Sequence, residues 1–168
     1  MHIVSIVRHK STVAFATAFI LSIGATAAWS ADSAVQDVDL TVQEVNDISV
    51  GGTVSLALTS SSAGQTLTGN SSSTYSLTSN SATGKKITAQ LSAPLETGLG
   101  LKVALQAPSG GTSAGAVALN SVSAVDVVTG VSAVAEADLT IDYTATAAPT
   151  VAPDTYSAEV TYTIVSDT

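Results

Sequence analysis

Apolar and polar residues alternate along most of the chain, and this alternation constrains the fold more than any other feature of the sequence. Side chains that repeat every two residues fit a strand with one buried face and one face in water, whereas a helix repeats every 3.6 residues. We therefore expect about eight short strands. The alternating runs lie at residues 38–42, 54–58, 75–77, 87–91, 99–105, 117–119, 139–143 and 156–164.

Turn-forming residues separate these runs. The stretches "SNSATGKK", "APLETG", "APSGGTSAG" and "APTVAPDT" are rich in Gly, Pro, Asn, Asp and Ser, which favour turns. Short strands with frequent turns indicate an all-β fold, an antiparallel immunoglobulin-like sandwich. The best place for a helix, though a poor one, is "GVSAVAEAD" at residues 130–138. Fifteen of the 26 residues from Thr59 to Gly84 are Ser or Thr, and there we expect an irregular edge region with one strand around Tyr75.

The first thirty residues have the order of a secretory signal peptide. Arg8, His9 and Lys10 form a positive start, an apolar run follows from Thr12 to Ile23, and small residues come next. The apolar run is too short to span a bilayer comfortably, so we expect cleavage between Ala27 and Ala31 and no stable membrane insertion afterwards. The sequence thus predicts three parts: a signal peptide (1–30), an N-terminal segment (31–50) and a β-sandwich domain (51–168).

The part that follows the signal peptide is acidic and has a narrow choice of side chains. From residue 32 onward, three lysines stand against 13 acidic residues, for a net charge near −10, and there is no Cys, His, Arg, Trp, Phe or Met. An acidic surface disfavours nucleic acid and anionic membranes as partners. Without cysteine, an exported domain must rely on its hydrophobic core rather than on disulfides.

The same composition excludes the common catalytic sites. Nucleophilic catalysis usually needs a His beside a Ser or Cys, and transition metals need imidazole or thiolate ligands. Paired carboxylates can hydrolyse glycosides, for which the candidates are Asp138 with Asp142, or Asp37 with Asp39, but four tyrosines are a poor lining for a sugar cleft. No Asp-x-Asp-x-Asp-Gly calcium pattern is present. We expect no enzyme, no cofactor and no metal site.

Both ends of the part after the signal peptide carry alternating apolar side chains. Those of the N-terminal segment are Ala34, Val38, Leu40 and Val42, and those of the closing run are Tyr156, Ala158, Val160, Tyr162 and Ile164. Residues 34–45 are either the first strand of their own sandwich or a donor strand that pairs with a neighbouring copy, and strand addition supplies main-chain hydrogen bonds and pockets for alternate side chains. The closing run either borders the acceptor groove or is an ordinary last strand.

Several stretches resemble the major subunits of alternate-chaperone fimbriae, the colonisation-factor-type pilins of Gram-negative bacteria. They are "VDLTVQEVNDISV" (38–50), "SNSATGKKITAQLSAPL" (79–95) and "ADLTIDYTATAAPTVAPDTYSAEVTYTIVSDT" (137–168). Other secreted fibre-forming β-sandwich proteins end in a similar strand. The resemblance implies a structural subunit of a cell-surface fibre that polymerises with copies of itself by donor-strand exchange. It also implies passage through the periplasm, with a chaperone and an outer-membrane usher as partners.

A second interpretation is a monomeric secreted adhesion or carbohydrate-binding module. Such modules bind sugars through exposed aromatic side chains, and the aromatic residues available are Tyr75, Tyr143, Tyr156 and Tyr162. Tyr156 and Tyr162 share the apolar face of the closing run, which favours packing in the core.

Overall fold

A computed structural model describes residues 33–60 and 62–167. The predicted signal peptide lies outside these residues. The chain divides into two units, residues 1–40 and 41–168. Within the first unit, residues 33–40 form no strand and are exposed.

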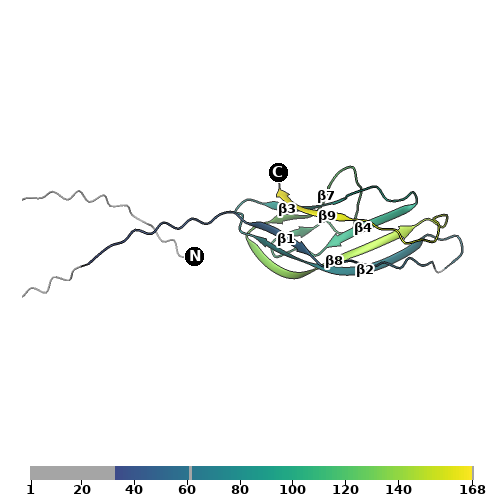
Figure 1. The fold of residues 1–168 in the computed structure, drawn as a ribbon, viewed down its shortest axis with the longest axis horizontal. Coiled ribbons are helices and arrows are strands. Elements are labelled where there is room, and N and C mark those ends of the chain that lie inside the picture. The colour runs from purple at the N-terminus through teal and green to yellow at the C-terminus, as the bar shows by residue number, and fades with distance from the viewer. Residues whose placement is uncertain (1–32, 61, 168) are drawn as a thin grey trace, which may run out of the picture. The chain divides into compact units, whose positions relative to one another are not determined.

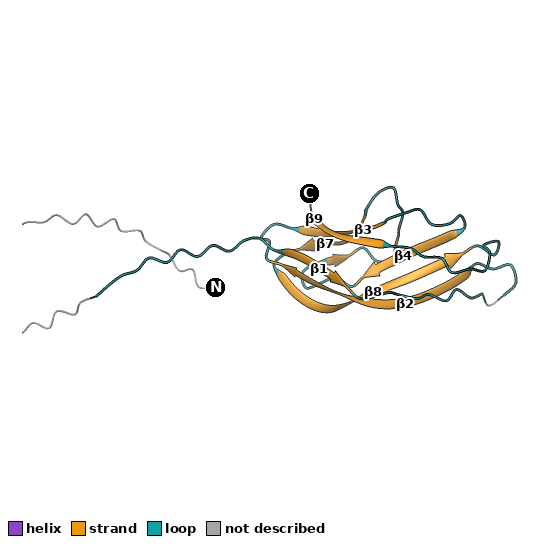
Figure 2. Ribbon diagram, viewed as in Figure 1, coloured by secondary structure: helices purple, strands orange, loops and turns teal. Residues whose placement is uncertain are grey.

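The second unit is an all-β sandwich, as the alternation predicts (Figure 1). Two antiparallel sheets hold nine strands: the first has the order β1-β2-β8-β4-β6 and the second β5-β7-β3-β9. Figure 2 shows strands and loops alone, and the described part of the chain contains no helix, so none there could cross a membrane. The strands are β1 (Asn46–Val50), β2 (Leu67–Ser79), β3 (Lys85–Leu91), β4 (Leu99–Leu105), β5 (Thr112–Ser113), β6 (Val117–Ala118), β7 (Val125–Val131), β8 (Val134–Ala147) and β9 (Val160–Ser166).

The core lies between the two sheets and is built from the inward side chains of the alternating strands. Tyr75 and Leu77 of β2, Ile87 of β3, Val103 of β4 and Ile141 of β8 are almost wholly excluded from water. In the described residues, every buried side-chain polar atom has a hydrogen-bond partner. An apolar interior with satisfied polar groups accounts for stability without disulfides.

The Ser/Thr-rich region contains the strand predicted around Tyr75, but this strand is longer than expected and lies inside its sheet, not in an irregular edge. β2 runs from Leu67 to Ser79 between β1 and β8, and pairs with β8 along almost its whole length. On the outer face of the sheet, hydroxyl groups bond between β2 and β8: Ser72 Oγ donates to Asp142 at 2.6 Å, and Thr144 Oγ1 donates to Asn70 at 2.9 Å. The length of β2 was not predicted because its polar side chains alternate in burial rather than in hydrophobicity.

Residues 54–58 were predicted to form a strand and do not. They run beside β2, past the end of β1. Val50 pairs with Tyr75 and Thr59 with Thr68, so nine residue steps on this side face only seven on β2. The two additional residues disrupt the regular ladder, although Val54, Leu56 and Leu58 keep alternating half-buried side chains. Gly69 allows the close approach, since a Cβ there would lie 2.5 Å from the Ala57 carbonyl oxygen.

Residues 130–138, the best place for a helix by sequence, belong to two strands. They cover the end of β7 and the start of β8. β7 was not predicted because its pairing with β3 shifts twice, which buries the consecutive residues Val127 and Val128 and removes the simple alternation.

Asp138 occupies a bulge in β8 with a positive φ of 58°. Tyr75 of β2 pairs with Leu139, and Leu77 pairs with Glu136, so β8 has one residue more than β2 between these two pairs. A side chain in the left-handed region is unfavourable, by about 1–2 kcal/mol for an ordinary residue. The bulge therefore stores strain that glycine would relieve.

We expect Asp138→Gly to raise the free energy of unfolding by about 0.5–1 kcal/mol, since the relief of strain exceeds the greater entropy of glycine in the unfolded chain. Ala137→Gly, at the neighbouring residue without a positive φ, should instead lower it. Urea unfolding of the two variants checks the sign, and destabilisation by Asp138→Gly would show that the aspartate side chain itself is needed.

Candidate functional site

The apolar side chains of the N-terminal segment, defined here as residues 34–42, are exposed. Val38 is 70% exposed, Leu40 89% and Val42 85%. Burial of such a side chain is favourable by about 1.5–3 kcal/mol. Three exposed apolar side chains at successive alternate positions therefore form a stretch that would gain from burial. The segment is extended and no strand includes it; Ala34 is exposed as well. The predicted strand at 38–42 is thus not formed, and the first strand of the sandwich, β1, begins later, at Asn46.

The outer edge of β9, called here the β9 edge, presents unpaired backbone groups. β9 pairs with β3 along all seven residues without a register shift. Glu159 and Asp167, just outside the strand, both bond toward β3, and in an antiparallel ladder the residues between them alternate in direction. The N–H and C=O groups of Val160, Tyr162, Ile164 and Ser166 therefore point away from β3, and no backbone hydrogen bond joins them to another described residue.

The inward side chains of this edge are apolar and incompletely covered. Val160, Tyr162 and Ile164 are half-buried and pack against the core. β9 thus combines free backbone groups with an apolar face, the two requirements for adding another strand.

The other three edge strands offer less to a partner. β5 and β6 have two residues each, and β1 has five before the chain continues irregularly along β2. Proteins commonly block open edges with short strands, bulges, prolines or lysines. β9 is seven residues long and has none of these, so it is the edge most open to pairing in the described sandwich.

Tyr156 and Ala158, which the sequence places in the closing strand, lie before it. β9 starts at Val160, and residues 155–159 are exposed loop. The side chain of Tyr156 is 41% exposed, and its hydroxyl donates to the Ala152 carbonyl at 2.9 Å, which directs this tyrosine toward its own loop. Only Val160, Tyr162 and Ile164 of the predicted set belong to the strand.

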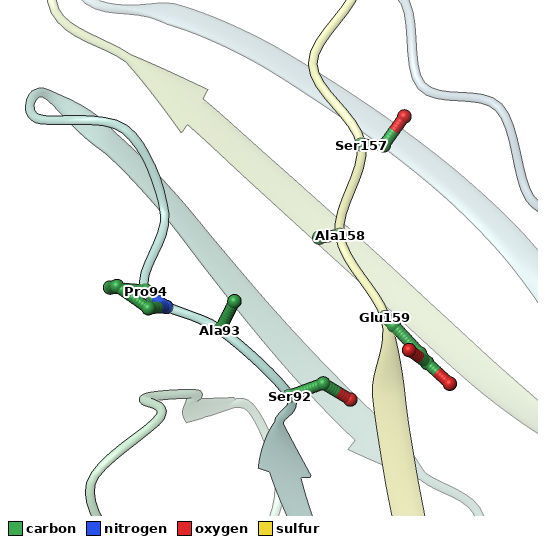
Figure 3. A pocket seen from close by; sticks show the side chains of 6 residues that line it. All are labelled: Ser92, Ala93, Pro94, Ser157, Ala158 and Glu159. Atoms are coloured by element: carbon green, nitrogen blue, oxygen red, sulfur yellow. The ribbon is translucent and has the colours of Figure 1, made fainter.

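Ala158 lines a shallow hollow next to this loop. Figure 3 shows residues 92–94, after β3, opposite residues 157–159, before β9. The two stretches are joined where the Ser92 N–H donates to the Glu159 carbonyl at 3.0 Å. Glu159 is its one titratable side chain, so the hollow carries no catalytic pair.

Two tyrosine hydroxyls connect the sheets behind β9. Tyr143 of β8 and Tyr162 of β9 lie 2.9 Å apart, oxygen to oxygen. Burial, and then the bond to Tyr143, raise the pKa of Tyr162 above its usual range, so the Tyr162 hydroxyl stays protonated at neutral pH. This bond fixes Tyr162, the middle apolar side chain of the β9 edge, against the opposite sheet.

A cluster of polar contacts around Asn80 holds the residues that join the N-terminal segment to β1. The Asn80 side chain accepts from the Val45 N–H at 2.7 Å and donates to the Gln43 carbonyl at 2.8 Å, and its backbone N–H donates to the Val45 carbonyl at 3.1 Å. Three hydrogen bonds from one residue keep 43–45 extended, in line with β1. We call this cluster, with Glu44 and Lys85, the latch.

Glu44 completes the latch through an ion pair. Its carboxylate lies 2.9 Å from the Lys85 ammonium and accepts from the Asn46 side-chain amide at 2.8 Å. Hydrogen bonds, first from Lys85 and then from Asn46 and Ser81, lower the pKa of Glu44 to about 2. The Glu44 carboxylate of the latch is therefore charged at every pH above the strongly acidic range.

We expect acid to open the latch. Because the pKa of Glu44 is lower in the folded protein than its usual value of 4.5, the stabilisation is complete above about pH 4.5 and is lost as the pH falls toward 2. An NMR titration of the Glu44 side-chain carbons should give a midpoint near 2, and protection of the Val45 amide from hydrogen exchange should fall over the same range. The Glu44→Gln variant should lack this pH dependence, and a midpoint near 4.5 would contradict the latch geometry.

The carboxylates nominated from the sequence are either too far apart for a glycosidase or lie exposed in the N-terminal segment. Asp138 and Asp142 are four residues apart on β8, about 13 Å along a strand, whereas glycosidase carboxylates lie about 5–9.5 Å apart. Asp37 and Asp39 are both exposed in the N-terminal segment. No group of three or more metal-ligating side chains occurs in the described residues.

The tyrosines of the binding-module interpretation do not share an exposed patch. Tyr75 is buried, with its hydroxyl bonded to the Gln106 carbonyl, and desolvation raises its pKa to about 12. Tyr143 and Tyr162 are half-buried and bonded to each other. Tyr156 is the only one of the four that is exposed.

Sequence reasoning missed the latch. Asn80 and Lys85 lie in a stretch that the sequence predicts to be a turn, and Glu44 lies in the N-terminal part of the chain. No local pattern connects residues that are about 35 positions or more apart. Their contact depends on the pairing of β1 with β2.

Comparison with known proteins returned no relative: no protein-family model, no curated protein and no solved structure matches this chain.

Proposed function

We propose that this protein is a structural subunit of an extracellular fibre, in which the N-terminal segment of one copy pairs with the β9 edge of the next. The observation that carries the proposal is the exposure of Val38, Leu40 and Val42, a strand-like alternating stretch outside the sandwich. Because the donor and the acceptor are different surfaces, repetition of the contact gives an open filament rather than a closed dimer.

The two surfaces are complementary in chemistry. The segment offers alternating apolar side chains and an unpaired backbone. The β9 edge offers free N–H and C=O groups at Val160, Tyr162, Ile164 and Ser166, with half-buried apolar side chains at the first three. Burying Val38, Leu40 and Val42 would contribute about 1.5–3 kcal/mol each before the entropy of ordering is subtracted.

The two surfaces are also complementary in length. Nine extended residues span about 30 Å, and seven-residue β9 spans about 23 Å. The segment is therefore long enough to cover the whole edge.

β1 restricts the end of β9 at which pairing starts. Parts of β1 and β9 come within 8 Å of each other, Cα to Cα. Two strands must lie about 9.6 Å apart for a third strand to fit between them. Glu44 binds Lys85, which pairs with Ser166, so β1 starts near the Ser166 end. An incoming strand is expected to pair first at Val160, the end of β9 that lies away from the start of β1.

Export to the cell surface completes the proposal and rests on the predicted signal peptide. The chaperone and the usher follow only from the resemblance to fimbrial subunits. The net charge near −10 after the signal peptide favours solubility of such a fibre.

Size analysis with negative-stain electron microscopy tests the proposal. We would compare purified protein from residue 31 onward with a form that lacks residues 31–42 and so keeps the latch. Filaments from the longer form alone would support strand exchange. Monomers from both forms, at concentrations up to the millimolar range, would overturn it, and binding of the monomer on a glycan array would then favour the adhesion-module alternative.

A further inference from the structure

We propose that the latch prevents the N-terminal segment from closing onto the β9 edge of its own sandwich and so reserves it for a second copy. The inference rests on the proposed function and adds its control. It is carried by the three hydrogen bonds of Asn80 and by the position of the latch at one end of β9.

The directions of the strands show why self-closure needs a reversal of the chain at the latch. β1 starts at Asn46, beside the latch, and leads away from it along β2 (Figure 1). β9 ends at Ser166, whose partner Lys85 binds Glu44, so this end also lies at the latch. To lie along β9 and then continue into β1, the chain would have to turn through about half a circle within residues 43–45.

The latch holds those residues in the opposite conformation. Two hydrogen bonds join Val45 to Asn80 just beyond the last ladder pair, Asn46 and Ser79: one is between backbone groups, and the other is accepted by the Asn80 side chain. The bond from the Asn80 side chain to the Gln43 carbonyl continues the extended path. A tight turn at 43–45 would break all three bonds and would separate Glu44 from Lys85.

A turn placed earlier in the chain does not restore self-closure. A hairpin turn uses two to five residues, so a reversal before Gln43 would take up Val42 and, in a turn of three or more residues, Leu40 as well. These are two of the three side chains that docking needs. With the latch closed, only the edge of another copy can accept the complete segment.

Disulfide trapping tests the inference, because the chain has no cysteine of its own. Asp39→Cys is combined in one chain with Thr163→Cys or, in a second variant, Thr161→Cys. These positions are exposed and alternate with the apolar ones, so the docking side chains stay intact. After mild oxidation, mass spectrometry and gel mobility separate intramolecular disulfides from intermolecular ladders.

The latch is opened in this background by Asn80→Ala and, in a variant that keeps Asn80, by Lys85→Gln. The matched control is Asn70→Ala. It removes an asparagine within β2 whose side chain bonds to Thr144 on the outer face of the sheet, away from the latch. We expect ladders with the native latch. The intramolecular share should rise about ten-fold in either latch variant, equivalent to about 1.4 kcal/mol, and should not change in Asn70→Ala. Thermal unfolding confirms that each variant is folded.

Three results would count against the inference, and they are distinguishable. Ladders with the same intramolecular share in native and latch variants would overturn the role of the latch while strand exchange stands. A high intramolecular share with the native latch would overturn it as well. Absence of both products in every background, together with absence of filaments, would overturn the proposed function itself.

Discussion

Leu40→Asp is expected to abolish fibre formation and to leave the sandwich folded. Leu40 is 89% exposed in the isolated chain, so the substitution removes no native contact. In the proposed fibre the same side chain is buried against the β9 edge of the next copy, and placing a carboxylate in an apolar site is unfavourable by several kcal/mol. A loss of this size lowers the affinity of each junction by more than a thousand-fold. Sedimentation and electron microscopy measure the assembly, and circular dichroism the fold.

Thr41→Asp is the matched control for this prediction. It adds the same charge one residue later, on the opposite face of the extended segment, where the side chain would face water in the fibre. Fibres should form from this variant at nearly the native level. Equal loss in both variants would mean that charge in general, and not burial of Leu40, limits assembly.

Ile141→Ala is expected to lower the free energy of unfolding by about 3–4 kcal/mol, within the range of about 2–5 kcal/mol that is usual for such a truncation in a core. Ile141 is fully buried on β8, the central strand of its sheet, between Ser73 of β2 and Leu105 of β4. Nothing can collapse into the space without displacing a ladder on either side. In a domain of ordinary stability, about 5–15 kcal/mol, the loss would lower the melting temperature by about 10 °C or more.

Thr140→Ala is the control on the neighbouring residue. Its backbone N–H still donates to Gln106 Oε1 and its carbonyl still accepts from the Gln106 N–H, so we expect a change within about 0.5 kcal/mol. Calorimetry of the two variants measures the difference. A loss below about 1 kcal/mol for Ile141→Ala would show that the core does not depend on close packing at β8.

Alternation alone was enough to predict the fold class and most of the core strands. The runs at 87–91, 99–105 and 139–143 lie within β3, β4 and β8, because each has one face in the core and one in water. β2 was predicted only around Tyr75 and β7 not at all, for a physical reason that the two strands have in common. In β2 the serines around Tyr75 alternate in burial but not in hydrophobicity, and β7 buries two consecutive valines at a bulge, so burial there does not follow hydrophobic periodicity.

The candidate site was predictable only where it depends on local pattern. The apolar residues of the N-terminal segment and three of the five in the closing run could be named from alternation. Their surroundings could not, since the free edge of β9 depends on sheet order and the Asn80 contacts depend on register between distant strands. Residues 43–45 are bound to Asn80 of the same copy, and pairing of residues 34–42 with another copy stays a prediction, which the cross-linking experiment tests.

The pairing of β1 with β2 has a mechanical consequence. The five residue pairs from Asn46–Ser79 to Val50–Tyr75 form one antiparallel ladder, and a force applied at Gln43 along the line of β1 slides β1 lengthwise against β2. All the bonds of the ladder are then strained together, in shear, and none can be peeled open before the others. The N-terminal connection is therefore built to bear tension, which is the load a thread of such subunits would carry in flowing liquid.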